Sequence, residues 1–268
     1  MSNLTPIIAL ITDYGLKDTY VAQLKGVILS YRRDVIIVDV THEVEPFNEL
    51  EAAFLLLTYV KYMPPETIHL CIVDPKVGGE RRPIIIKTVR GDCFIGPDTG
   101  IMAPAAESLG IMNIYEIDQS MLPKRFSETF HGRDVFAHAA GKLSIGLSLD
   151  KIGKLISDYE RIEIPKPLFR EDFIESTVLH VDRFGNIITN LKYNEINVGF
   201  GDIVEIYMPD TVVRCPLVQY YSRVEEGSLL TTIGGSGYLE ISINKGRASE
   251  KLRLRPGDRL KVKLVKNI

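Results

Sequence analysis

The sequence predicts an α/β N-terminal domain with a mainly parallel central sheet over residues 1–166, followed by a smaller antiparallel all-β, barrel-like domain over residues 167–268. Three observations lead to this prediction. Apolar, β-branched runs alternate with helix-like segments through the first half, as they do in layered α/β proteins. These runs are continuously apolar, which indicates a sheet covered by helices on both faces. After Pro165-Lys166-Pro167 only short strand-like runs follow, separated by Gly, Asn and Asp, as in antiparallel sheets and small barrels.

The individual elements follow from the same patterns. Buried strands are expected in the first half at residues 7–12, 35–40, 68–73, 84–89 and 93–95. Helices are expected at residues 20–30, from position 48 to about 62, and from position 132 to about 147. Asp18 and Thr19 are candidate caps of the first helix, Asn48 caps the second, and Pro64-Pro65 ends it. In the second half, strands are expected at residues 176–181, 203–207, 212–217, 229–233, 238–243 and 259–265.

Composition and charge narrow the class of protein. The chain has 268 residues, 45% of them hydrophobic, and a net charge of −3 from 32 basic and 35 acidic side chains. This balance gives no electrostatic reason to expect nucleic acid or an anionic membrane as a partner. The three cysteines (Cys71, Cys93 and Cys215) form no C-x-x-C pair, so free thiols and a reducing, cytoplasmic location are expected. No signal peptide or membrane-spanning run is visible.

Several common catalytic signatures are absent from the sequence. It contains no phosphate-binding loop, no dinucleotide fingerprint, no H-E-x-x-H and no G-x-S-x-G. The five histidines are scattered, at positions 42, 69, 131, 138 and 180. His131 and His138 fall on roughly one helical face, but no carboxylate stands at metal-ligand spacing from them. A catalytic metal is therefore not expected.

Polar residues at the ends of predicted strands and the starts of helices remain as candidates. Asp13 and Asp74 follow two apolar strands, at the edge where ligands of open α/β sheets bind. The loop that starts at Asp74 also carries Arg81, within reach of the carboxylate. His131 precedes a helix, whose dipole favours the neutral ring. Taken singly, each of these residues could be a turn or cap residue, so spacing alone indicates only an α/β enzyme with an acid-rich pocket.

A set of segments, taken together in their order along the chain, indicates the function more specifically than any single residue. Through these segments the sequence resembles the S-adenosyl-L-methionine hydrolase family, also called the S-adenosylmethionine hydroxide adenosyltransferases. Fluorinase and chlorinase are relatives of this family. The resemblance covers nearly the whole chain. The segments that carry it are residues 11–15, 18–26, 41–42, 74–81, 96–98, 129–134, 182–190 and 236–240.

The resemblance implies a substrate and a set of binding residues. It implies that S-adenosyl-L-methionine binds at a domain boundary that a neighbouring subunit completes in a homotrimer, with no cofactor. Asp13 is expected to bind the ribose hydroxyls, Phe47 to pack near the sugar and the sulfonium, and Gly132 to lie beside the substrate. The expected contacts to the methionine end and to adenine are Asp182, Phe184, Asn186, Tyr221 with Tyr220 beside it, Ser236, Tyr238, Glu240 and Asn244.

The resemblance also implies the reaction. The hydrolase branch carries an Asp, Arg and His set, matched here by Asp74, Arg81 and His131, whereas halogenases have Tyr at the Asp position and a halide-binding Ser after the His position. A carboxylate repels a halide, so Asp74 favours water as the nucleophile that attacks ribose C5′ and releases adenosine and methionine. The sequence leaves open whether Asp74, His131 or the whole trio activates the water. A chlorinase-like halogenase, a non-catalytic S-adenosylmethionine- or adenosine-binding protein and a nucleoside hydrolase are the alternatives.

Overall fold

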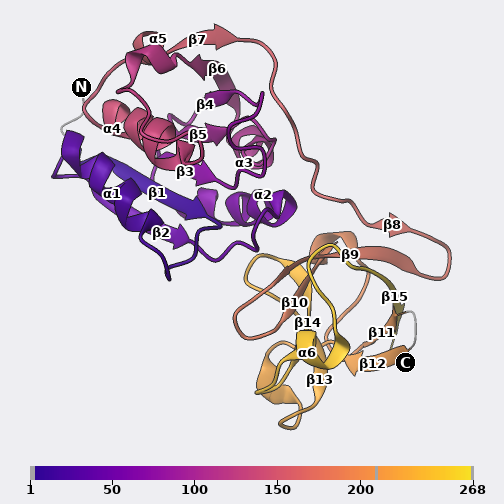
Figure 1. The fold of residues 1–268 in the computed structure, drawn as a ribbon. Helices are drawn as coiled ribbons and strands as arrows, with labels where there is room; N and C mark the ends of the chain where they lie inside the picture. Colours follow the sequence, from indigo (N-terminus) through magenta and orange to yellow (C-terminus); the bar gives the residue numbers. More distant parts are fainter. Residues whose placement is uncertain (1–3, 209–210, 267–268) are drawn as a thin grey trace. The chain divides into compact units, whose positions relative to one another are not determined.

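A computed structural model describes residues 4–208 and 211–266 (Figure 1). The described residues divide into two compact units, one up to Glu163 and one from Ile164 onward. The proposed domain boundary at residues 166–167 lies three residues beyond this division. Each unit has its own hydrophobic core and is described by itself. None of the described helices is long and apolar enough to cross a membrane.

The first unit is built on a seven-stranded sheet with the order β2-β1-β3-β5-β4-β6-β7. The strands are β1 (Ile7–Thr12), β2 (Ile36–Thr41), β3 (Ile68–Ile72), β4 (Pro83–Thr88), β5 (Cys93–Pro97), β6 (Ile111–Ile117) and β7 (Gly153–Ile156). Neighbours from β2 to β5 are parallel, while β4 is antiparallel to both β5 and β6, and β7 is antiparallel to β6. Five strands therefore share one direction, and the predicted mainly parallel sheet is confirmed.

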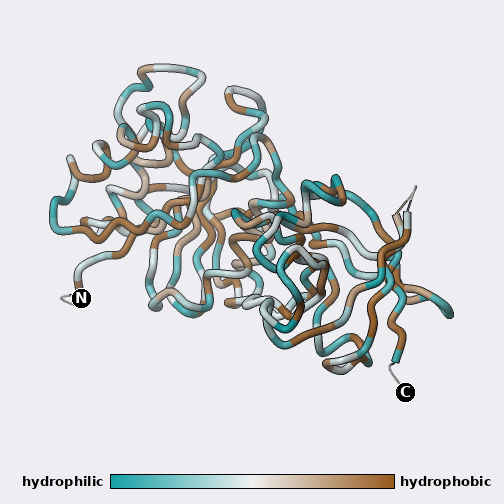
Figure 2. Tube along the Cα trace, turned by 90° about the horizontal axis from the view of Figure 1, so that it is seen from below, coloured by the Kyte–Doolittle hydropathy of each residue, from teal (hydrophilic) through white to brown (hydrophobic). Residues whose placement is uncertain are grey.

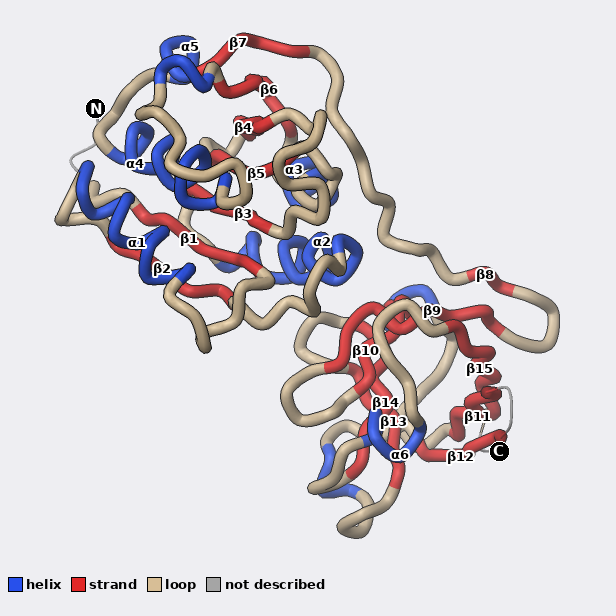
Figure 3. Tube along the Cα trace, in the orientation of Figure 1, coloured by secondary structure: helices blue, strands red, loops and turns tan. Residues whose placement is uncertain are grey.

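Helices cover both faces of this sheet, as the continuous apolar strands predict. They are α1 (Tyr20–Tyr31), α2 (Glu49–Tyr59) with the turn η1 (Val60–Tyr62), α3 (Ala103–Ser108), the π-helical η3 (Gly132–Ala137), α4 (His138–Ser144) and α5 (Leu149–Ile152). Alternate residues of β1 enter different cores: Leu10 packs with α1, η3 and α4, whereas Ile11 packs with α2 and α3. Figure 3 shows these helices in blue around the red strands of the sheet.

Some local predictions for this unit are wrong. Strand β2 is only half-buried, because it is the edge strand of the sheet. Thr19 occupies the N-cap position of α1 but its side chain makes no cap hydrogen bond, whereas Asn48 accepts from the N–H of Glu51 as predicted. The third predicted helix begins as a π-helix and ends at Ser144 rather than Leu147. The sequence interpretation also missed β6, β7 and α3.

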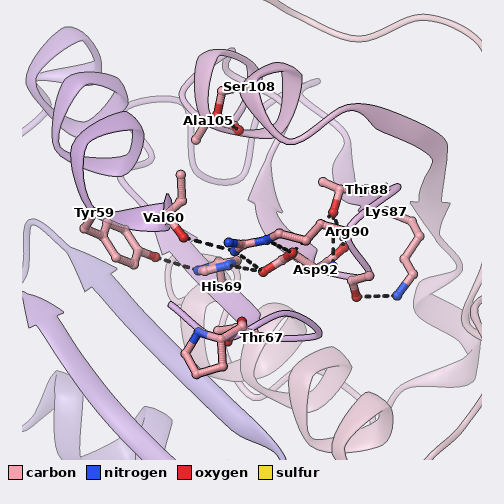
Figure 4. Close-up of polar contacts among 12 residues, drawn as sticks. Tyr59, Val60, Thr67, His69, Lys87, Thr88, Arg90, Asp92, Ala105 and Ser108 are labelled. Atoms are coloured by element: carbon pink, nitrogen blue, oxygen red, sulfur yellow. Dashed lines mark hydrogen bonds and ion pairs between the residues drawn. The ribbon is translucent and has the colours of Figure 1, made fainter. Parts of the chain in front are cut away.

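A buried polar network ties β3 to η1 and to the β4–β5 hairpin (Figure 4). The Tyr59 hydroxyl donates to His69 Nδ1 at 2.7 Å, and His69 Nε2 donates to Asp92 Oδ1 at 3.1 Å. Arg90 binds both oxygens of Asp92 and the carbonyl of Val60. Burial lowers the pKa of His69, so the ring is neutral. Burial alone would raise the pKa of Asp92, but the hydrogen bonds from His69 and Arg90 outweigh it and lower that pKa to about 2.

The second unit is an antiparallel sheet that curls into a nearly closed barrel, which confirms the predicted class. Its strands are β8 (Leu168–Phe169), β9 (Ile174–Val181), β10 (Ile187–Lys192), β11 (Ile203–Met208), β12 (Thr211–Pro216), β13 (Leu229–Ile233), β14 (Tyr238–Ile243) and β15 (Arg259–Val265), with one short helix, α6 (Ala248–Leu252). The order is β12-β11-β15-β9-β10-β14-β13, and β8 pairs with β9. Hydrogen bonds join β12 and β13, the two ends of this order: the Val218 N–H donates to the Thr231 carbonyl, and the Thr231 hydroxyl donates to the Pro216 carbonyl. Figure 2 shows the hydropathy of each residue along the chain, with hydrophobic residues in brown and hydrophilic residues in teal.

Candidate active site

A pocket of about 320 Å³ opens at the carboxyl ends of β1 and β3. Asp13 directly follows β1, and Asp74 lies two residues after β3. This is the edge of an open α/β sheet at which ligands bind. The pocket is lined by Asp13, Tyr14, Tyr20, Pro46, Phe47, Asp74, Val77, Thr129, Phe130 and Gly132. Four of the residues that the sequence analysis selected therefore share one cavity: Asp13, Phe47, Asp74 and Gly132.

Asp74, Arg81 and His131 form one hydrogen-bonded cluster beside this pocket. Arg81 Nε lies 3.0 Å from Asp74 Oδ1 and 3.1 Å from Oδ2, and Arg81 Nη2 also donates to Oδ2. The same Nη2 lies 2.7 Å from His131 Nδ1. The side chains of Asp74 and Arg81 are only 7% and 4% exposed, and the Arg81 guanidinium stacks over the Phe136 ring. The structure thus brings together three residues from two distant loops, as the resemblance implies.

His131 is held as a neutral imidazole. Burial lowers its pKa first, and the guanidinium groups of Arg81 and Arg125 lower it further against the opposing charges of Asp74 and Glu128. The expected direction is therefore confirmed, and burial and two cations are causes that the sequence analysis did not name. Because a guanidinium only donates, Arg81 requires His131 Nδ1 to accept, which places the ring proton on Nε2.

Asp13 and Phe47 are linked through the backbone. The Phe47 N–H donates to Asp13 Oδ2 at 3.0 Å, and Phe47 adopts a φ of +65°, a left-handed conformation that is strained for a bulky residue. The Phe47 side chain is 68% exposed at the pocket. Burial raises the pKa of Asp13, partly offset by the Phe47 N–H and reinforced by the nearby charge of Asp74. The strained loop thus presents an aromatic ring and a carboxylate to the same cavity.

The second unit holds the remaining predicted residues in two local clusters. In the turn between β9 and β10, Asp182 Oδ1 accepts from the N–H groups of Phe184 and Asn186, and Asp182 Oδ2 accepts from Asn186 Nδ2. This turn is closed by its own hydrogen bonds and leaves the Phe184 ring 72% exposed.

The other cluster surrounds the buried Glu240 of β14. The Tyr221 hydroxyl donates to Glu240 Oε1 at 2.6 Å, and Ser242 Oγ donates to the same oxygen at 2.8 Å. Asn244 Nδ2 donates to the Val224 carbonyl at 2.8 Å. Tyr221 begins a short 3₁₀ turn (η5, Tyr221–Arg223).

Two other predicted residues flank this cluster. Ser236 lies in a turn in which the Gly237 N–H bonds to the Gly234 carbonyl. Tyr238 is buried at the start of β14.

Comparison with known proteins identifies the family. Residues 8–153 match the SAM hydroxide adenosyltransferase N-terminal domain, and residues 176–261 match the C-terminal domain of the same family. The chain belongs to the SAM hydroxide adenosyltransferase family.

Curated relatives and a solved structure agree with this assignment. The (R)-S-adenosyl-L-methionine hydrolase of Methanocaldococcus jannaschii is 36% identical over 257 residues, which is 92% of each chain. The enzyme of the same name from Salinispora tropica is 35% identical and covers 96% of this chain and 98% of its own. The fluorinase of Actinopolyspora mzabensis is more distant, at 26% identity. The crystal structure of an uncharacterized conserved protein from Thermotoga maritima superimposes with a TM-score of 0.89 at 35% identity, covering 96% of this chain and 99% of that one.

Gly132 lies against Tyr14 and leaves no room for a side chain. A Cβ atom at Gly132 would lie 2.5 Å from the Tyr14 hydroxyl oxygen, which is far inside van der Waals contact. The space that a side chain at position 132 would need is therefore filled by Tyr14. The sequence analysis missed Tyr14 and the two rings packed edge-on against it, Tyr20 and Phe130, each 5.7 Å away between centroids. The signal available was the position of Tyr14, immediately after the strand-ending Asp13.

The resemblance also implies departures from the family pattern at three positions, and the structure shows what these residues touch. Burial raises the pKa of Glu49, and the charge of Lys76, which stands where the resemblance implies Gly, partly offsets this rise. Thr99, where Asn is commoner, has a buried hydroxyl with no hydrogen-bond partner among the described residues. His138, where Pro is common, has Nδ1 2.8 Å from the Tyr31 hydroxyl and so joins α4 to α1.

The described residues contain no group of side chains arranged to bind a metal ion, and their cysteine thiols are buried. Over residues 4–208 and 211–266, no three His, Cys, Asp or Glu residues are grouped to hold a metal ion. Cys71, Cys93 and Cys215 are buried free thiols, as predicted. Burial raises the pKa of the Cys215 thiol to about 12, so this thiol is not a nucleophile near neutral pH.

Proposed function

We propose that this protein is an enzyme that hydrolyses S-adenosyl-L-methionine to adenosine and L-methionine. The observation that carries the proposal is the buried Asp74–Arg81–His131 cluster beside a pocket that also contains Asp13. The family assignment and the hydrolase names of the curated relatives support it.

Asp74 is the group that we assign to accept the proton of the attacking water. The single lone pair of the neutral His131 ring is directed at Arg81, and its other nitrogen already carries a proton. Asp74 Oδ2 accepts two bonds from Arg81, but Oδ1 accepts only one, so a lone pair of Oδ1 is left for water. Arg81 orients the carboxylate, and His131 orients Arg81.

The step is one displacement at ribose C5′. The water oxygen forms a bond to C5′ while the C5′–S bond breaks, and the electron pair returns to sulfur, which becomes the neutral thioether of methionine. One water proton passes to Asp74 and then to solvent. The sulfonium is a good leaving group, so positioning of the water supplies most of the acceleration, at best about 7–11 kcal/mol. A general base typically adds about 10²–10⁴-fold.

The substrate contacts belong to the same proposal. Asp13 binds the ribose hydroxyls, Phe47 packs against the sugar and sulfonium, and Gly132 allows close approach. The residues proposed for the methionine and adenine ends are Asp182, Phe184, Asn186, Tyr221, Ser236, Tyr238, Glu240 and Asn244. We further propose a cytoplasmic homotrimer whose neighbouring subunits complete each site. It needs no cofactor and has no nucleic-acid or membrane partner.

The test is incubation of the pure protein with S-adenosyl-L-methionine in oxygen-18 water, with mass analysis of all products. Hydrolysis at C5′ gives adenosine that carries the heavy oxygen, together with methionine. The same incubation in concentrated chloride reports the halogenase alternative as 5′-chloro-5′-deoxyadenosine. Free ribose among the products indicates a nucleoside hydrolase. Ligand binding without methionine release indicates a binding protein.

A further inference from the structure

The second nitrogen of His131 faces another guanidinium. Arg125 Nη1 lies 3.0 Å from His131 Nε2, on the opposite side of the ring from Arg81. Arg125 is also paired with Glu128, three residues along the same loop. His131 is buried, whereas the Arg125 side chain is 33% exposed. The imidazole is therefore held between one buried and one partly exposed cation.

This arrangement disfavours the protonated ring. An imidazolium carries an N–H on both nitrogens, and each would point at a group that only donates. In the neutral ring one nitrogen accepts, and Arg81 takes it, because its guanidinium is fixed by Asp74. Arg125 then acts on Nε2 through its charge rather than through a hydrogen bond.

The loop that carries Arg125 is anchored to the helix that follows His131. The backbone N–H groups of Phe126 and Ser127 both donate to Asp134 Oδ2, at 2.9 and 2.7 Å. Asp134 is buried in η3 and is paired with Arg133. The backbone next to Arg125 is thus held in place relative to His131.

We propose that Arg125 is a positioning residue that keeps His131 neutral and thereby keeps Arg81 bound to Asp74. This inference rests on the proposed function, because it assigns Arg125 to the same reaction. Protonation of His131 would remove the acceptor for Arg81 Nη2 and place a third cation between two guanidinium groups. Arg81 would then lose one of the two partners that fix it.

Four charged groups act on the ring, and they predict shifts of opposite sign. Arg81 and Asp74 reach it from the loop after β3, and Arg125 and Glu128 reach it from the loop before η3. The cation Arg125 lowers the pKa of His131, so its removal raises that pKa. The anion Glu128 raises the pKa of His131, so its removal lowers it.

The experiment is a pH titration of His131 by histidine-selective NMR, together with the pH profile of kcat/KM for adenosine release. The variants are Arg125→Gln, Arg125→Lys and Glu128→Gln. In Arg125→Gln both the His131 titration and the acid limb move to higher pH by about one unit, the low end expected for a partly exposed charge. In Glu128→Gln both move to lower pH. Arg125→Lys, which keeps the charge, stays close to the wild type.

A matched control is Arg32→Gln, which removes an arginine of similar exposure (30%) that is also paired with a nearby acid, Asp34. It should leave both curves in place. Unfolding midpoints close to the wild type establish that each variant is folded. Unchanged titration in Arg125→Gln, or shifts of the same sign in Arg125→Gln and Glu128→Gln, would overturn the assignment. The NMR titration needs no turnover, so absence of adenosine release in the wild type would count against the proposed function alone.

Discussion

Removal of the Arg81 side chain should damage both stability and catalysis, by amounts that the structure allows us to work out. Arg81→Ala deletes three contacts to Asp74 and one to His131. It leaves the Asp74 carboxylate, whose side chain is 7% exposed, without its counter-charge. Breaking a buried ion pair from one side costs about 3–5 kcal/mol. That is a large part of the roughly 5–15 kcal/mol by which a domain is stable.

The pairing itself is measured by a double-mutant cycle in denaturant unfolding. Because Asp74→Ala/Arg81→Ala removes both charges together, the double variant should cost about 2–3 kcal/mol less than the sum of the single variants. Adenosine release should fall by about 10²–10⁴-fold in each single variant, and the double variant should lose little more, because the two residues act as one unit. Additive stability losses, or additive losses of log kcat/KM, would refute this reasoning.

Three further predictions follow from particular contacts. Gly132→Ala places a Cβ atom 2.5 Å from the Tyr14 hydroxyl oxygen and should lower the free energy of unfolding by about 1–3 kcal/mol. In denaturant unfolding, adding Tyr14→Phe should recover much of this loss, and no recovery would mean that another contact is responsible. Phe47→Gly relieves a left-handed φ of +65° and should raise the free energy of unfolding by up to about 1 kcal/mol. The same variant should raise KM for S-adenosyl-L-methionine, and an unchanged KM would argue against a substrate contact. The pKa of His69 is lowered in the folded protein, so as the pH falls below about 6.5 the unfolded chain takes up a proton on this residue before the folded chain does. The free energy of unfolding of the wild type, relative to that of the non-titrating His69→Gln, should therefore shrink between about pH 7.5 and pH 5.5. A constant difference would contradict the neutral ring in the folded protein.

Much of the fold could be predicted because its signals are local. Continuous apolar runs such as residues 7–12 and 68–73 indicated a sheet buried on both faces, and Asn48 marked a real helix start. Position at a strand end then placed Asp13 and Asp74 at the same edge. The elements that were missed have mixed patterns: β10 carries Thr189 and Asn190 in its interior, directly after a polar turn. Strand β6 has only two fully buried residues, Ile114 and Ile117, and carries an Asn and a Glu among its apolar residues.

The site was predictable in part, for a similar reason. Asp74, Arg81 and His131 belong to segments that carry the family resemblance, and the structure brings these three together. Arg125 lies in a charged stretch that looks like an ordinary solvated loop, and its place against His131 depends on backbone bonds to Asp134. Tyr14 matters because of what a side chain at Gly132 would strike. Neither the contact between Arg125 and His131 nor that between Gly132 and Tyr14 can be predicted from the spacing of these residues in the sequence.

The most direct test of the account is a crystal structure of the protein with an unreactive analogue of S-adenosyl-L-methionine in which carbon replaces the sulfonium. We expect one ordered water within hydrogen-bonding distance of Asp74 Oδ1, in line with C5′ and opposite the replaced sulfur, while Arg81 still bridges Asp74 and His131. An analogue whose C5′ lies away from these three side chains, or a path behind C5′ that holds no water, would contradict it.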